Sequence, residues 1–124
     1  MNRIAEKISD SELEVMKLLW AAGEPMGLSE IIAVLTEKLD WKEPTVKTVV
    51  RNLRLKDAIE QVGRGKYAAV VTEREYNEFS ARSYVNRIFD GSAKKLVATL
   101  VSDGQLTEDE VAELLEALRG GKNG

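Results

Sequence analysis

The hydrophobic pattern of this 124-residue chain changes its period at Asp57, and this change strongly constrains the fold. Before Asp57, apolar residues recur at the three- and four-residue intervals of amphipathic helices. After Asp57, two strand-like runs, Ile59–Val62 and Tyr67–Val71, flank the glycine-rich turn Gly63–Lys66. We therefore expect three helices followed by a β-hairpin with a basic tip.

The three helices before the hairpin have recognisable start signals. The first is expected from Asp10 to about Ala22, because Ser9 and Glu12 have the spacing of a capping box. Gly27 is a plausible N-cap for the second helix, and Pro44 suits the first turn of the third, which we expect to end at about Lys56. The stripes expected to be buried are Leu13, Met16, Leu19 and Trp20, then Leu28, Ile31, Ile32, Leu35 and Leu39, then Val46, Val49, Val50 and Leu53.

Three further helices are expected after the hairpin. Capping boxes at Thr72–Glu75 and Thr107–Glu110 begin the first and the last of them. Their apolar faces are large, and we interpret them as a dimerisation surface, with a ligand pocket as the alternative. The expected dimerisation residues are Tyr76, Phe79, Tyr84, Ile88, Phe89, Leu96, Leu100, Val111, Leu114, Leu115 and Leu118.

Composition excludes several classes of chemistry. The chain has no cysteine and no histidine, which rules out thiol and imidazole catalysis and zinc sites built from those residues. Metal binding or acid catalysis by Glu108, Asp109, Glu110 and Glu113 is the alternative to helix capping, and we favour capping. We expect no enzyme activity, no catalytic residue, no metal and no cofactor. No apolar run is long enough to cross a membrane and Met1–Lys7 lacks a secretory signal, so we expect a cytoplasmic protein.

Charge is unevenly distributed along the chain. The net charge is −3, yet residues 42–66 carry seven lysines and arginines against three acidic residues. This local net charge of +4 coincides with the third helix and the hairpin, and is suited to a phosphate backbone.

The order of three helices and a hairpin is that of a winged helix-turn-helix, in which the third helix enters the major groove of DNA. The fold is thus expected to be mainly α with a small β-hairpin, followed by a C-terminal helical dimerisation region. We expect domains at residues 1–71 and 72–119 and a flexible tail at 120–124. Trp20 is interpreted as core rather than as a base-stacking residue, and Trp41 is left open. The expected DNA-binding residues are Thr45, Lys47, Thr48, Arg51, Arg54, Arg64 and Lys66.

Three segments of the chain, taken in order, resemble the penicillinase-repressor family (BlaI/MecI/CopY type) of bacterial winged-helix transcriptional regulators. They are Ile8–Met16 leading into Leu19-Trp20, Asp40-Trp41 before Thr45–Thr48 and Arg51–Leu53, and Arg87–Gly91 before Leu96-Val97. The resemblance implies a homodimer, joined through its C-terminal helices, that binds a palindromic DNA operator and represses transcription. It assigns groove reading to Thr45, Lys47, Thr48 and Arg51, and the wing to Arg64 and Lys66.

The resemblance also implies release from DNA by proteolysis, triggered by a membrane sensor protease in response to β-lactam or envelope stress. The cleaved Asn-Phe bond of the best-known members corresponds here to Thr99-Leu100, and the cysteine cluster of the copper-responsive branch is absent. From the residues alone, a second function stays open: a winged-helix protein-interaction module that does not bind DNA.

Overall fold

The computed structural model describes residues 4–120, except for the side chains of residues 118–120. The chain divides into two compact units, Met1–Ser80 and Ala81–Gly124, which are described separately. The functional boundary expected after residue 71 stays a prediction, and the expected tail lies outside the described residues beyond Gly120.

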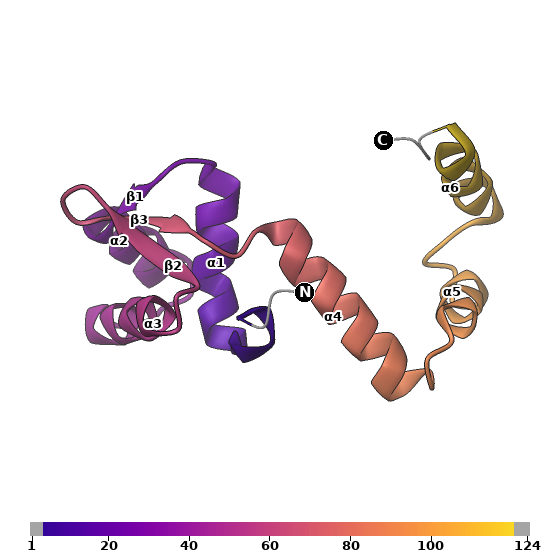
Figure 1. Cartoon of the computed structure of the whole chain (residues 1–124), viewed down its shortest axis with the longest axis horizontal. Coiled ribbons are helices and arrows are strands. Elements are labelled where there is room, and N and C mark those ends of the chain that lie inside the picture. The colour runs from indigo at the N-terminus through magenta and orange to yellow at the C-terminus, as the bar shows by residue number, and fades with distance from the viewer. Residues whose placement is uncertain (1–3, 121–124) are drawn as a thin grey trace. The chain divides into compact units, whose positions relative to one another are not determined.

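The N-terminal unit contains the three expected helices (Figure 1). A short 3-10 helix, η1 (Ala5–Lys7), precedes α1 (Asp10–Ala22), α2 (Leu28–Lys38) and α3 (Glu43–Leu55). The capping box of α1 is formed, because the Ser9 N–H donates to Glu12 Oε1 at 2.9 Å and the Glu12 N–H donates to Ser9 Oγ at 3.3 Å. Gly23 then ends α1 at a φ of 69°, a left-handed conformation that glycine adopts without strain.

The hairpin belongs to a three-stranded antiparallel sheet. Strands β1 (Met26–Gly27), β2 (Ile59–Val62) and β3 (Lys66–Ala69) lie in the order β1-β3-β2. Tyr67 of the central strand β3 is paired on both sides, with Met26 of β1 and with Gln61 of β2. Strand β3 ends at Ala69, two residues before the expected end at Val71. It ends there because the N–H groups of Val70 and Val71 both donate to Ala58 O instead of continuing the ladder.

Apolar stripes of the three helices meet in one core beside this sheet. Val15, Met16, Ile31, Leu35 and Leu53 are almost inaccessible to solvent, and each buried side chain of this size contributes roughly 1.5–3 kcal/mol to folding. Trp20 packs against this core as expected for its helix face, and Trp41 does so as well.

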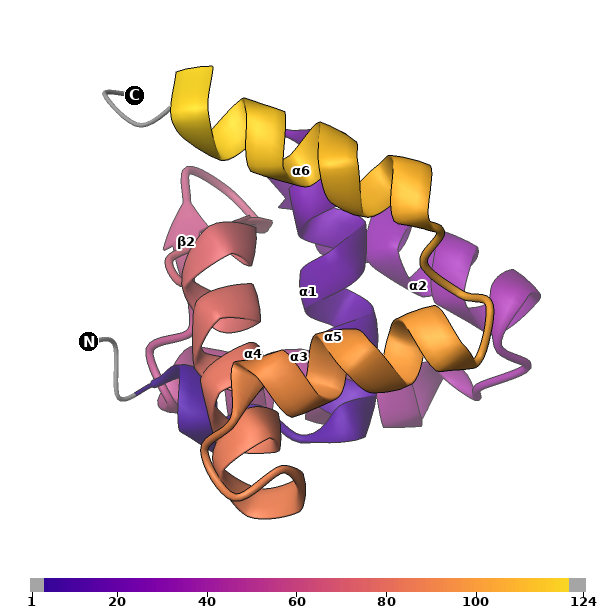
Figure 2. The ribbon, with the colours of Figure 1, turned by 90° about the vertical axis from the view of Figure 1, so that its right-hand side faces the viewer.

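The C-terminal unit begins within α4 (Glu73–Ile88) and contains α5 (Ala93–Ser102) and α6 (Glu108–Gly120), joined by a short loop (Figure 2). Both expected capping boxes are present: the Thr72 N–H donates to Glu75 Oε1, and the Thr107 N–H donates to Glu110 Oε1, each at 2.9 Å. Between residues 81 and 117 every side chain is at least partly exposed. This unit therefore has no enclosed core of its own in the described part of the chain.

None of the described helices has the length and apolar character needed to cross a membrane.

Candidate nucleic-acid interface

Helix α3 has one buried face and one exposed face. Val46, Val49, Val50 and Leu53 are buried against α1 and α2, and this contact fixes the rotation of α3 about its axis. The five DNA-binding residues expected on this helix are all exposed on its other side: Thr45, Lys47, Thr48, Arg51 and Arg54. The spacing of the valines thus determines which polar side chains face outward.

The outward face of α3 carries positive charges that are accessible to an approaching anion. Lys47 Nζ lies 3.0 Å from Glu43 Oε2, but both side chains are more than half exposed, so this pair is easily exchanged for another partner. Within the described residues, Arg51 and Arg54 take part in no salt bridge. Thr48 Oγ1 donates to Pro44 O at 2.9 Å, which leaves the hydroxyl lone pairs free to accept a hydrogen bond.

The wing is the β2–β3 hairpin, with its turn at Gly63–Lys66. Gly63 and Gly65 have φ values of 65° and 62°, conformations that favour glycine and place Arg64 at the exposed tip between them. The Leu28 N–H donates to Gly65 O at 3.0 Å, and Gly27 lies opposite Lys66 in the sheet. The turn of the wing is therefore fixed to the start of α2.

A groove of about 740 Å³ joins these parts. Lys47 from α3 and Arg64 and Lys66 from the wing line it, together with the first turn of α2. Its two carboxylates already have partners, since Glu43 pairs with Lys47 and Glu30 Oε1 accepts the Gly27 N–H at 3.0 Å. The groove is suited to a phosphate-rich strand. Sequence reasoning missed the contribution of Gly27–Ser29, for which the N-cap position of Gly27 was the only signal.

Lys56 belongs to the basic segment but does not face outward. Its Nζ lies 2.6 and 2.8 Å from the two carboxylate oxygens of Glu12 and 2.9 Å from Lys7 O. The Glu12 side chain is only 6% exposed. Burial raises the pKa of Glu12, but the hydrogen bonds from Lys56 and Ser9 and the charge of Lys56 outweigh burial and hold this pKa below its ordinary value of 4.5. This contact ties the end of α3 to the start of α1.

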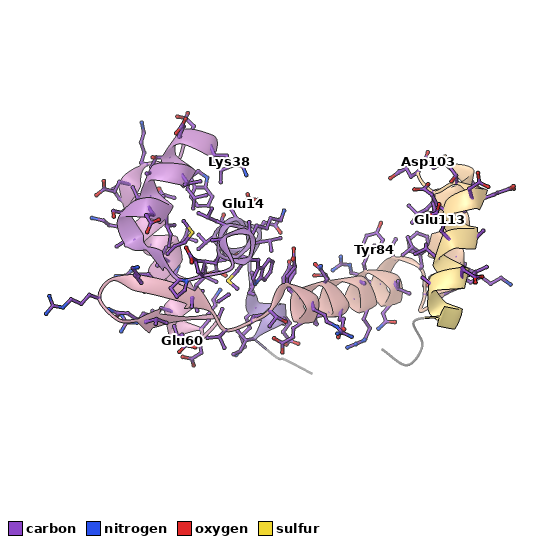
Figure 3. The ribbon with its side chains drawn as sticks, turned by 90° about the horizontal axis from the view of Figure 1, so that it is seen from above. Glu14, Lys38, Glu60, Tyr84, Asp103 and Glu113 are labelled. Atoms are coloured by element: carbon purple, nitrogen blue, oxygen red, sulfur yellow. The ribbon has the colours of Figure 1, made fainter. Side chains whose placement is uncertain are left out.

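The expected dimerisation residues differ in how far they are exposed to solvent. Tyr76 and Phe79 pack against the core of the N-terminal unit. Four others are 45–55% exposed to solvent: Tyr84, Ile88, Leu114 and Leu115. Tyr84 projects from α4 in Figure 3. The Phe89 ring lies 5.8 Å from that of Tyr84, centroid to centroid. Leu96, Leu100 and Val111 are half-buried, whereas the Leu118 side chain lies outside the described residues.

The segment expected to be cleaved is helical. Thr99 and Leu100 lie in α5, and Thr99 Oγ1 donates to Lys95 O at 2.8 Å. Thr99 is exposed and Leu100 half-buried.

The chain is similar to known proteins along most of its length. A family model described as penicillinase repressor matches residues 8–120. The chain is 31% identical to the penicillinase repressor of Bacillus licheniformis over 120 residues, which cover 94% of this chain and 93% of the relative. It is 26% identical to the methicillin resistance regulatory protein MecI of Staphylococcus aureus (strain N315) over 121 residues, covering 95% and 98% of the two chains.

Proposed function

Since this chain belongs to the penicillinase-repressor family, we propose that it represses transcription as a homodimer whose two α3 helices read the half-sites of a palindromic operator. It is a DNA-binding transcriptional repressor and not an enzyme. The observation that carries the residue assignment is the outward face of α3 beside a groove lined by Lys47, Arg64 and Lys66. A repressor acts where its operator DNA lies, and the proposed location is therefore the cytoplasm.

Two roles divide the interface. Thr45, Thr48 and Arg51 contact base edges in the major groove, where hydroxyl and guanidinium groups can distinguish base pairs. The remaining cations hold the phosphate backbone: Lys47, Arg54, Arg64 and Lys66. Of these, Lys47 is able to reach either the base edges or the backbone. The first turn of α2 also lines the groove, and the positive end of its helix dipole favours a phosphate.

Dimerisation supplies the second recognition helix. The exposed apolar side chains of the C-terminal unit, among them Tyr84, Ile88 and Leu114, support association with a second copy of the chain. A two-fold dimer requires a palindrome, with half-sites about one helical turn, or roughly 34 Å, apart.

Release from DNA is proposed to follow cleavage at Thr99-Leu100 by a membrane sensor protease or by a protease that acts downstream of it. In a single chain no described side chain of residues 81–117 is buried, so local unfolding of α5 costs little once the dimer opens, and it can then expose this bond. Mass spectrometry of the chain from β-lactam-treated cells should find a fragment ending at Thr99. Induction with only intact chain present would contradict this part of the proposal.

The experiment that tests the DNA-binding assignment is selection of bound duplexes from a random pool, followed by affinity measurements on the selected site. Arg51→Ala and Thr48→Ala should each relax base preference by about 1–3 kcal/mol, whereas Lys66→Ala should weaken selected and random duplexes alike. Equal losses on both duplexes for all three variants would overturn the base-reading assignment. An unenriched pool at low salt would favour a protein-interaction module instead.

A further inference from the structure

The N-terminal unit contains a second hollow, of about 360 Å³, that shares no residue with the groove of the nucleic-acid interface. It lies where the end of α1, the segment leading to β1, strand β3 and the start of α4 meet. Small residues leave the space open, because Gly23, Ala68 and Ala69 are part of its lining. Its volume is in the range of small-molecule sites.

A fixed aromatic ring forms part of the wall. Trp20 lines the hollow, and its indole Nε1 donates to Val71 O at 2.8 Å. The Tyr76 ring, whose centroid lies 5.8 Å from that of Trp20, packs beside the indole. Leu19 and Pro25 add apolar surface. The hollow therefore offers an apolar surface that is already ordered before any ligand arrives, which lowers the entropic cost of binding.

The charges at this hollow all favour a cation. Glu24 and Glu73 are its only charged lining residues, both are exposed, and in the described part of the chain neither forms a salt bridge. Gly23 stands at the C-terminus of α1, the negative end of the helix dipole, and the last turn of α1 has no basic residue to offset it.

The N-terminus of α4 does not reverse this preference. The Thr72 N–H already donates to the Glu75 carboxylate at 2.9 Å, and the Glu75 N–H donates to Thr72 Oγ1 at 3.1 Å. Glu73 and Glu75 also place two acidic residues in the first turn. The capping box therefore occupies donors that an anionic ligand would need.

We propose that this hollow is a binding site for a small organic cation, with an ammonium group near Glu24 and Glu73 and an aromatic or branched apolar body against Trp20. A cation close to an indole face gains a further electrostatic attraction from the ring. The site is separate from the proposed DNA interface, and its test needs no DNA.

The test compares probes of similar shape and different charge: 2-phenylethylamine, 2-phenylethanol and phenylacetate. The variant Trp41→Phe leaves Trp20 as the only tryptophan, so its fluorescence reports on the hollow. At low salt, the amine should give a saturable change with a Kd about tenfold below that of the alcohol, and phenylacetate should bind weakest. Amide NMR shifts at Gly23, Ala68 and Ala69 in the unaltered chain provide the same comparison without a substitution.

Charge-removing variants locate the ammonium group. The double variant Glu24→Gln/Glu73→Gln should raise the Kd of the amine at least fivefold and leave that of the alcohol unchanged. Glu60→Gln is the matched control, since Glu60 is an exposed carboxylate of β2 outside the hollow (Figure 3). No saturable binding of the amine, equal binding of amine and alcohol, or an equal loss in Glu60→Gln would overturn the proposal.

Discussion

At the scale of single residues, Glu12 shows what sequence reasoning can and cannot find. Its spacing from Ser9 predicts the capping box, which is formed. The same carboxylate also accepts both short hydrogen bonds from Lys56, which lies 44 positions away. Nothing in the local pattern indicates that second partner, because it depends on how α1 and α3 pack. The positive charge of Lys56 was for this reason counted with the DNA-facing charges.

We expect Lys56→Met to lower the free energy of unfolding by about 2–4 kcal/mol, because it leaves the Glu12 carboxylate buried without its cation. The double variant Glu12→Gln/Lys56→Met should be more stable than Lys56→Met, since it removes the buried charge and keeps a capping-box residue at position 12. Urea unfolding of the parent chain, Glu12→Gln, Lys56→Met and the double variant forms the cycle. Additive losses would show that the two side chains are not coupled.

The lowered pKa of Glu12 predicts a pH dependence of stability. A carboxyl whose pKa is lower in the folded state stabilises the fold fully above its unfolded-state pKa, and this contribution is lost as the pH falls through the folded-state pKa. The unfolding free energy should therefore decrease below about pH 4.5, and less steeply in Glu12→Gln. Urea unfolding between pH 7 and pH 3 measures both curves. Parallel curves would contradict the role assigned to Glu12.

At the scale of elements, helices were easier to predict than strands. Capping residues and a 3.6-residue period mark the three helices, so both bounds of α1 and α3 and the start of α2 were predicted to within a residue or two. Strand β1 is two residues long, too short to show any alternation, and it exists only because β3 offers a free edge to Met26 and Gly27. The third strand matters for the site, because it fixes the wing to the start of α2.

The wing should contribute affinity without base preference. Arg64→Ala/Lys66→Ala should lower the slope of log K against log salt by about two, because two phosphate contacts are lost, and should leave the selected sequence unchanged. Lys17→Ala, which removes an exposed cation of α1 outside the groove, is the control and should not change the slope. The measurement is a salt titration on the selected duplex. A changed base preference in the wing variant would mean that the wing enters a groove.

At the scale of the whole molecule, periodicity identifies an apolar stripe but not the surface that covers it. Along α4, Tyr76 and Phe79 pack on the core of their own N-terminal unit, whereas Tyr84 and Ile88, further along the same helix, are about half exposed. All four were predicted as dimerisation residues, and a role of the first two in a dimer stays a prediction. The leucines of α6 are a second case in which the stripe is predicted but its covering surface is not. Among the described residues of one chain, nothing buries Leu114 or Leu115.

Leu114 provides a test of the dimer that leaves the N-terminal core untouched. Leu114→Glu replaces a 55% exposed apolar side chain with a charge, and should raise the Kd of the dimer at least about 100-fold, or roughly 2.7 kcal/mol, because a carboxylate would enter an apolar interface. Sedimentation should show a monomer, while the duplex with a single half-site should be bound as before. Ala112→Glu adds the same charge to α6 outside the leucine positions and should leave the dimer intact. If Leu114→Glu stays dimeric and binds the palindrome normally, the second recognition helix must be supplied through another surface.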